Sequence, residues 1–262
     1  MPGPTEITAT QLNRLIGTPC APTIIDICLD EDHALDPRLI PGARRWPHDR
    51  IEELAPDLTR AVIVCQKGKK LSQGAAALLR THGVAAETLE GGMVGWAEAG
   101  FPAIPADAVD GSLWVTRQRP KIDRIACPWL IRRFVDPNAG FLFVAPAEVM
   151  AVADRFGATP FDVGGGPFSH IGDRCAFDAM LDHFSLRTPA LSRLASIVRA
   201  ADTGRLDEAP QAAGLLAASL GFSRMHRDDL AQLDAAMPLY DALYRWARDA
   251  SEEAHHHSGA SE

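Results

Sequence analysis

The most reactive arrangement in this sequence is a cysteine that directly follows a short β-branched apolar run. Cys65 comes after Ala61-Val62-Ile63-Val64 and precedes Gln66, Lys67, Gly68, Lys69 and Lys70, with a helical pattern from Ser72 onward. A side chain at this point lies at the carboxyl edge of a sheet, in a loop whose amides can point at the sulfur. The amides, the helix N-terminus and three lysines would lower the pKa of the thiol and populate the thiolate.

A thiolate at Cys65 is a nucleophile that can take a sulfane sulfur and hold it as a persulfide. The surrounding amides and lysines suit a small sulfur-containing anion as donor, such as thiosulfate. The alternative is a buried structural cysteine at the end of a strand, because cysteine is among the residues most often buried.

A second group of polar side chains lies further along the chain. His170 belongs to a glycine-rich loop ahead of a helical pattern that carries Asp178 and Asp182 on one face. With Asp202 from the next helix, His170 and Asp178 could bind a divalent ion or act in acid–base chemistry. The alternative is that both aspartates lie on a solvated helix face and that His170 caps or packs.

The stretch from Arg117 to Arg133 is rich in cations. Trp114, Cys127 and Trp129 are interleaved with them, and these residue types prefer burial. Arginines beside buried aromatic rings suggest a pocket for an oxyanion. The alternative is a solvated basic turn followed by a short helix.

The elements that must position these residues fall into two groups. Before residue 106, buried strands at 23–27 and 61–64 and a helix at 72–82 predict an α/β domain with a parallel sheet flanked by helices. Residues 102–112 have the composition of a linker. Beyond them we predict a strand from about residue 113 followed by a basic loop, a second strand at 140–144, and helices at 129–134, 147–155, 177–184, 189–201, 209–220 and 227–250.

The predicted organisation is therefore an α/β domain at 1–106, a linker at 107–112, a mostly helical α+β domain at 113–250 and a disordered tail at 251–262. The tail contains His255, His256 and His257, which we interpret as part of a frayed terminus. The sequence does not indicate an oligomeric state.

Charge and composition exclude several classes of protein. The formal net charge of −8 argues against nucleic acid as a partner, because binding would need a local basic patch. No apolar stretch reaches the ~20 residues that cross a membrane, and no signal peptide is visible. Five scattered cysteines fit reduced thiols, so we expect a cytoplasmic protein.

Four ordered motifs in the first domain resemble the rhodanese family. They are Asp26 at the end of a strand, Ile40-Pro41-Gly42-Ala43, the loop Cys65–Lys70, and the closing pattern from Leu89 to Pro102. The resemblance implies a rhodanese-type sulfurtransferase with Cys65, Lys70 and Asp26 as catalytic residues and Gln66, Lys67, Gly68 and Lys69 as the donor-binding loop.

The first domain also departs from the rhodanese pattern. Cys28, Gln66 and Lys70 stand where the family commonly has arginines. Because lysine lacks the planar fork of arginine, the identity of the sulfur donor stays open. Cys28 or Cys20 could resolve a persulfide or disulfide with Cys65, or each could simply fill space as a small apolar residue.

The second domain resembles the C-terminal domain of chromate-resistance (ChrB-type) proteins. The motifs are RPKIDRIACPWLIRRFVDP, FDVGG, HIGDRCAFD, IVRAAD, APQAAGLLAASLGFSR and YDALYRW, within residues 113–246. The resemblance implies resistance to chromate, or sensing of it. It also assigns substrate-binding positions (Lys121, Arg124 and Cys127) and metal positions for iron or zinc (His170, Cys175, Asp178 and Asp202).

Two functions follow from these patterns. The first is a sulfurtransferase that forms a cysteine persulfide, coupled to a domain that binds an oxyanion or a metal. The second is a chromate-responsive regulator of a resistance operon, with the rhodanese-like domain as an accessory. A rhodanese-like domain that only binds partners usually lacks the loop cysteine, which is present here.

Overall fold

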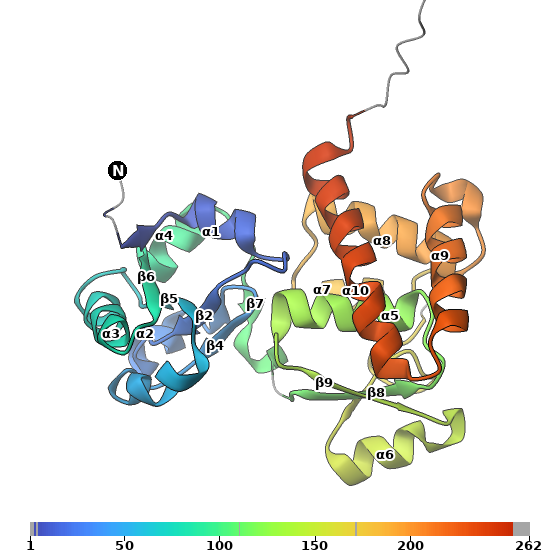
Figure 1. The fold of residues 1–262 in the computed structure, drawn as a ribbon, viewed down its shortest axis with the longest axis horizontal. Coiled ribbons are helices and arrows are strands. Elements are labelled where there is room, and N and C mark those ends of the chain that lie inside the picture. Colours follow the sequence, from blue (N-terminus) through green and yellow to red (C-terminus); the bar gives the residue numbers. More distant parts are fainter. Residues whose placement is uncertain (1–2, 4, 110, 171, 254–262) are drawn as a thin grey trace, which may run out of the picture.

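The computed structural model describes residues 3, 5–109, 111–170 and 172–253. Two domains lie side by side, and the chain passes once from the first to the second (Figure 1). The His255–His257 run and the rest of the tail from 254 lie outside the described residues. Within the described part of the chain, no helix has both the length and the apolar character needed to cross a membrane.

The first domain is built on a five-stranded parallel sheet with strand order β1-β6-β5-β2-β4. A short antiparallel pair, β3 with β7, lies beside it. The elements in chain order are β1 Glu6–Ile7, α1 Ala9–Leu15, β2 Thr23–Asp26, α2 Asp30–Leu35, β3 Arg38–Leu39, β4 Ala43–Arg45, a 3-10 segment His48–Asp57, β5 Arg60–Val64, α3 Lys70–Thr81, β6 Ala85–Leu89, α4 Gly92–Glu98, β7 Ile104–Pro105 and a 3-10 turn Ala106–Val109.

Both faces of this sheet are buried, because successive side chains along a strand point to opposite sides. Ile24, Val62 and Leu89 pack with residues of α1 and α4. Ile25 and Ile63 pack with α3 and the 3-10 segment before β5. This burial explains the unbroken apolar runs at both central strands and confirms the predicted α/β fold.

The second domain begins with a parallel βαβαβ unit. Its elements are β8 Leu113–Arg117, α5 Asp123–Leu130 with a π-helical turn Ile131–Val135, β9 Gly140–Val144, a 3-10 turn Pro146–Glu148, α6 Val149–Phe156 and β10 Thr159–Pro160. The strand order is β10-β8-β9, so the chain adds β9 on one side of β8 and β10 on the other. Helix α6 covers one face of this small sheet, where Val149 packs on Val115.

A layer of helices covers the opposite face of the sheet (Figure 1). It contains α5 together with α7 Ala176–His183, α8 Pro189–Asp202, a 3-10 turn Leu206–Glu208, α9 Ala212–Met225, α10 Asp229–Arg245 and a π-helical turn Trp246–Ala250. Trp114 and Phe141 of the sheet belong to the core of this layer. The predicted mostly helical α+β fold is confirmed.

Helix α5 differs from its prediction in one consequential way. The sequence predicts a basic loop followed by a helix from Trp129, whereas the helix begins at Asp123. Ile122, just before it, has φ 32°, which reverses the chain direction sharply. The early start buries the Asp123 side chain, which is only 1% exposed.

The two domains share one continuous hydrophobic core. The backbone amide of Gly42 donates to the carbonyl of Phe134 at 2.6 Å. Gly17, with φ +76°, lies so close to Phe134 and Tyr244 that a Cβ there would come within 2.3 Å of the Phe134 ring. The domains are therefore packed closely together.

Candidate active site and metal centre

Cys65 follows β5 directly and lies at the carboxyl edge of the first sheet. Its side chain is 6% exposed, and the loop that follows it ends where α3 begins at Lys70. The amides at the start of α4 hold the loop from outside: Met93 donates to the carbonyl of Cys65 at 3.1 Å, and Val94 donates to that of Gln66 at 3.1 Å. With its carbonyls tied outward, the loop presents its amides to the sulfur.

A pair of glycines allows this close approach. Gly68 has φ +63°, and a Cβ there would lie 2.3 Å from the carbonyl oxygen of Leu89. Gly92 has φ +59°, and a Cβ there would lie 2.0 Å from the carbonyl oxygen of Cys65. Gly68 of the loop and Gly92 of α4 thus lie against each other, and neither position has room for a Cβ.

The Cys65 thiol is tuned by its hydrogen bonds. Burial raises its pKa, and hydrogen bonds to the sulfur lower it by more. The Cys65 sulfur is hydrogen-bonded with the Ser72 hydroxyl at 3.2 Å, and the backbone amides of Ser72, Lys69 and Lys67 add to the lowering. The pKa of Cys65 therefore lies below that of an ordinary cysteine, which favours the nucleophilic thiolate.

The other residues predicted for this site lie around the loop. Lys67, Lys69 and Lys70 are exposed at its rim, where they add positive potential, and Gln66 is half-buried. Asp26 is buried at the end of β2, where its Oδ1 accepts from the amide of Cys28 at 2.7 Å. Its Oδ2 is buried without a hydrogen-bond partner. Asp26 thus holds the turn next to the loop.

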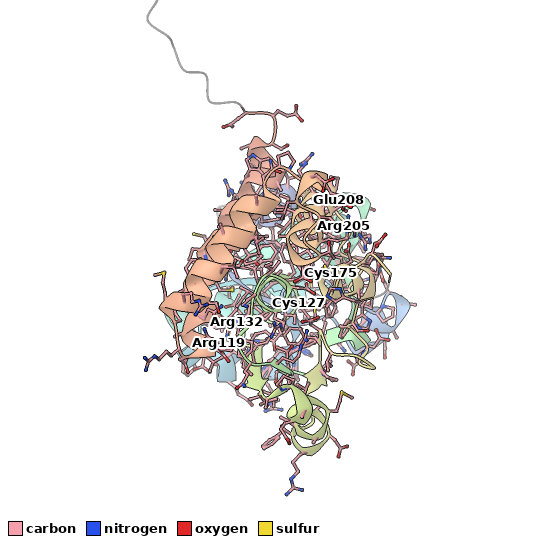
Figure 2. The ribbon with its side chains drawn as sticks, turned by 90° about the vertical axis from the view of Figure 1, so that its right-hand side faces the viewer. Arg119, Cys127, Arg132, Cys175, Arg205 and Glu208 are labelled. Atoms are coloured by element: carbon pink, nitrogen blue, oxygen red, sulfur yellow. The ribbon has the colours of Figure 1, made fainter. Side chains whose placement is uncertain are left out.

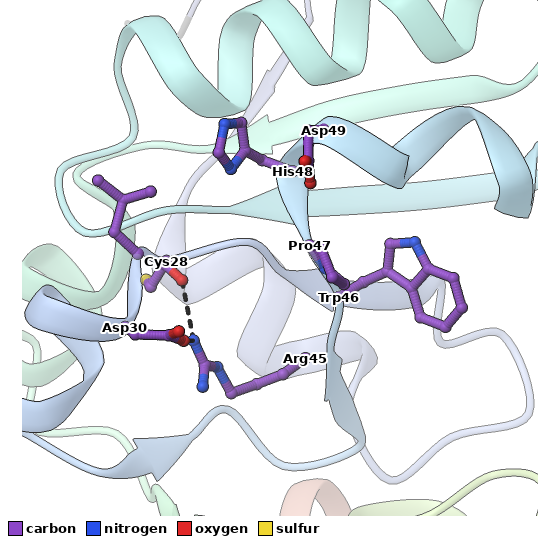
Figure 3. Close-up of a pocket in the computed structure, with 8 residues that line it drawn as sticks. Cys28, Asp30, Arg45, Trp46, Pro47, His48 and Asp49 are labelled. Atoms are coloured by element: carbon purple, nitrogen blue, oxygen red, sulfur yellow. Dashed lines mark hydrogen bonds and ion pairs between the residues drawn. The ribbon is translucent and has the colours of Figure 1, made fainter.

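A cavity of about 350 Å³ lies beyond Cys28, at the carboxyl ends of β2 and β4 (Figure 3). Arg45 crosses it, donating to the Cys28 carbonyl at 3.0 Å and pairing with Asp30 at 2.8 Å. Burial and the nearby Asp26 carboxylate raise the pKa of Cys28. A negative charge on Cys65 raises it further. Cys28 is accordingly a neutral thiol beside the reactive one.

The second site lies at the carboxyl ends of β8 and β10. Nε2 of His170 lies 3.4 Å from Oδ1 of Asp162, 3.7 Å from Oδ2 of Asp123 and 3.2 Å from Oδ2 of Asp202. Asp162 follows β10 with φ 48°, and its side chain is 7% exposed. The ligand atoms of Asp123, Asp162 and His170 all lie within 4.8 Å of one another.

Backbone amides at the start of α7 hold the Asp123 carboxylate of this site in place. The amides of Ala176 and Phe177, at the start of α7, donate to the two oxygens of Asp123 at 2.9 and 3.0 Å. Burial, with the charges of Asp202 and Asp162, raises the pKa of Asp123 to about 8. Burial, with Asp162 next, also raises the pKa of Asp202.

The arginines of the basic stretch are engaged in internal contacts. Arg117 and Arg124 both pair with Oδ2 of Asp162, at 2.7 and 3.2 Å, and Arg124 also donates to two backbone carbonyls. Arg119 donates to the carbonyls of Ser223 and His226. Arg133 and the indole of Trp129 share the carboxylate of Asp241. These contacts engage much of the basic stretch within the protein, although Nε of Arg117 is buried without a hydrogen-bond partner.

The structure brings only part of the predicted metal set together. His170 and Asp202 approach each other, but Asp178 is fully buried against Arg199, whose Nη1 lies 2.9 Å from both of its oxygens. Cys175 caps α7, and its sulfur is 3.7 Å from Asp178. Figure 2 shows Cys175 inside the helical layer, where it is fully buried.

The predicted substrate-binding positions differ in exposure and contacts. Arg124 reaches Asp162, whereas Lys121 is exposed. Cys127 is fully buried (Figure 2), and its sulfur lies 3.5 Å from Oδ1 of Asp123. Burial, with the Asp123 charge, raises the pKa of this thiol well above its ordinary value.

Comparison with known families divides the chain in the same way as the fold does. The rhodanese-like domain family matches residues 8–99, and the ChrB C-terminal domain family matches residues 114–247, just over half of the chain. The chain belongs to the family with a ChrB C-terminal domain. Its first domain is rhodanese-like.

Individual relatives cover one part of the chain each. Protein ChrB of Cupriavidus metallidurans is 39% identical over 135 residues, which is 51% of this chain and 40% of that protein. A rhodanese-like domain protein from Staphylococcus aureus is 30% identical, covering 35% of this chain and 90% of its own, with a TM-score of 0.31. A thiosulfate sulfurtransferase from Pseudomonas aeruginosa is 25% identical, covering 39% and 19%, with a TM-score of 0.32.

Sequence reasoning missed Asp123 and Asp162 in the ChrB domain. Both lie inside motifs that the sequence analysis singles out, Asp123 in RPKIDRIACPW and Asp162 in FDVGG. An aspartate two residues before a run of glycines is the signal that points to Asp162. Asp123 gives a weaker signal, because it reads as one more polar residue of a basic loop.

Proposed function

We propose that the protein is a sulfurtransferase that carries sulfane sulfur as a persulfide on Cys65 and serves chromate resistance. The observation that supports this most directly is the place of Cys65, buried at the carboxyl end of β5 with its sulfur 3.2 Å from the Ser72 hydroxyl near the start of α3. Such an arrangement stabilises a thiolate before the reaction and the anionic persulfide after it.

The proposed reaction has two balanced steps. In the first, the Cys65 thiolate attacks the sulfane sulfur of thiosulfate; a new S–S bond forms, the old one breaks, and sulfite leaves with the bonding electron pair. In the second, an acceptor such as cyanide or a thiolate attacks the terminal sulfur, and Cys65 leaves as the thiolate. No external oxidant or reductant enters either step.

The cavity beside Cys28 is the proposed site for the acceptor. It has room for a small molecule, and its lining contains both basic and acidic side chains, Arg45 with Asp30 and Asp49 among them. Because the pKa of Cys28 is raised, this thiol stays neutral while Cys65 reacts. We propose that Cys28 lines the acceptor cavity as a small apolar side chain.

The ChrB domain supports the proposed link to chromate resistance, since its relative is Protein ChrB. We favour a small-molecule role for this domain over control of transcription. The net charge of −8 repels nucleic acid, and the arginines from 117 to 133 are largely paired within the protein. Five unpaired thiols suit the reducing cytoplasm, where we place the protein.

The persulfide proposal is tested by treating the full chain with thiosulfate or glutathione persulfide. We expect a mass gain of one sulfur atom at Cys65, and thiocyanate when cyanide is then added. Cys65→Ser should abolish both signals, and Cys20→Ser, which changes an exposed cysteine, should leave them intact. Sulfur transfer that survives in Cys65→Ser, or a wild-type chain that gains no sulfur from either donor, would contradict the proposal.

A further inference from the structure

We propose that the ChrB domain binds one divalent first-row transition-metal ion through Asp123, Asp162 and His170, with Asp202 at the edge of the coordination sphere. This site is independent of the persulfide chemistry at Cys65. It also differs from the set of ligands that the sequence suggests, sharing only His170 and Asp202 with it.

The spacing of the donor atoms suits such an ion. Oxygen and nitrogen ligands lie about 2.0–2.2 Å from zinc and similar ions, so neighbouring donors are about 3.0–3.6 Å apart. Nε2 of His170 is 3.4 Å from Asp162 and 3.7 Å from Asp123, which is close to that separation. Oδ2 of Asp202 is 3.2 Å from the same nitrogen. Asp202 does not belong to the set of three residues whose ligand atoms all lie within 4.8 Å of one another.

The position of the group in the fold is a second reason to expect a ligand there. Strands β9 and β10 lie on opposite sides of β8, and in parallel sheets ligands bind outside the carboxyl ends where the strand order reverses. A cavity of about 330 Å³ opens at this point, lined by Arg117, Asp162, Gly164 and His170 among others. It offers an ion a path in, and three protein ligands leave coordination positions free for water or substrate.

The local charge favours a cation over an anion. Three carboxylates face one imidazole, and both neighbouring guanidinium groups pair with a single oxygen, Oδ2 of Asp162. Its other oxygen, Oδ1, is therefore free to face His170. A bound cation would relieve the repulsion among the three buried or half-buried carboxylates.

The groups behind the donors support coordination too. The amides of Ala176 and Phe177 fix the plane of the Asp123 carboxylate, which is how outer-shell hydrogen bonds orient a ligand. Cys127 contacts Oδ1 of Asp123, whereas Oδ2 is the oxygen that faces His170. Oxygen and imidazole donors without a thiolate suit Mn²⁺, Fe²⁺ or Zn²⁺ and disfavour Cu⁺.

The test uses the full chain with His255, His256 and His257 changed to alanine, so that the tail cannot bind metal. After removal of metal with a chelator, the protein is dialysed against Mn²⁺ or Zn²⁺, and bound metal is measured by elemental analysis. We expect one ion per chain, and a rise in melting temperature on adding Mn²⁺. Asp162→Asn and His170→Gln should each weaken binding at least about tenfold.

Asp173→Asn is the matched control, because this carboxylate is 85% exposed and lies in the same loop region. It should bind metal as the parent does. If Asp162→Asn fails to fold by circular dichroism, His170→Gln decides, since that side chain is 40% exposed and substitution there leaves the core intact. Absence of stoichiometric binding, or equal affinity in His170→Gln and Asp173→Asn, would overturn the proposal.

Discussion

The Cys65 loop and the group formed by Asp123, Asp162 and His170 occupy equivalent places in two unlike domains. Each lies at the carboxyl ends of parallel strands, where backbone amides and helix N-termini face a ligand. The Cys65 loop is made of consecutive residues and is closed by contacts with the start of α4, at Gly92, Met93 and Val94. The second group draws its side chains from separate segments, the start of α5, the end of β10 and the loop before α7.

The two sites also differ in electrostatic character. Amides and exposed lysines surround Cys65 and stabilise negative charge on its sulfur. Around His170, carboxylates predominate, and the nearby arginines are already paired. A run of basic residues in the sequence thus adjoins a group in which three carboxylates surround one imidazole. The sign of a site is set by which charges remain unpaired after folding, and neighbours in sequence do not reveal that.

The largest effect is expected from Gly92→Ala. The added Cβ would meet the Cys65 carbonyl, and the positive φ of this residue costs a further ~1–2 kcal/mol for an L side chain. Displacing the loop by 1 Å should lower sulfur transfer about a hundredfold. The rate is measured as thiocyanate formed from thiosulfate and cyanide, and metal binding by the ChrB domain should not change.

Gly74→Ala is the control for this comparison. Gly74 lies in α3 with open space around its Cβ position, so alanine should keep full activity and stabilise the helix by about 0.5–1 kcal/mol. Equal activity in the Gly92 and Gly74 variants would mean that the contact between loop and α4 does not position the sulfur.

The next effect separates a structural carboxylate from a metal ligand. Asp178→Asn removes the charge that neutralises Arg199 inside the domain, and breaking such a buried pair costs about 3–5 kcal/mol. We expect urea unfolding to show this loss, while the folded variant still binds one Mn²⁺ per chain. Asp182→Asn, at an exposed ion pair, should change stability by no more than about 1 kcal/mol. Loss of Mn²⁺ binding in folded Asp178→Asn would place Asp178 among the ligands.

The rhodanese-like domain could be predicted far more fully than the ChrB domain's site. Its buried strands are continuous apolar runs, and the chemistry of Cys65 depends on residues within seven positions of it. The contact at Gly92 is also marked in the sequence, by the adjacent residues Gly91 and Gly92. Helix positions in the second domain are also visible, because α8 and α10 follow a helical pattern with a core-facing side.

The metal group could not be assembled from the sequence because it depends on tertiary contacts. Asp123 becomes buried only because α5 starts early and its carboxylate caps α7, more than fifty residues away. In the sequence, Asp178 lies four residues before Asp182 and is a reasonable metal ligand. In the structure, its carboxylate is instead paired with Arg199. Local pattern predicts which face of an element is polar, but the partner of each charge is a property of the whole fold.

The smallest effect we predict concerns the pH dependence at Cys65. Because its pKa is lowered, the thiolate forms, and the rate of sulfur transfer rises, at a pH below that of an ordinary cysteine. Ser72→Ala removes the side-chain hydrogen bond, so the midpoint should move to higher pH. At neutral pH the rate should fall at least about tenfold, since a hydrogen bond to a charged group contributes about 1.5–3 kcal/mol. Ser72→Thr keeps the hydroxyl and should keep the low midpoint. If Ser72→Ala does not shift the pH profile, the lowered pKa is due to the loop amides alone.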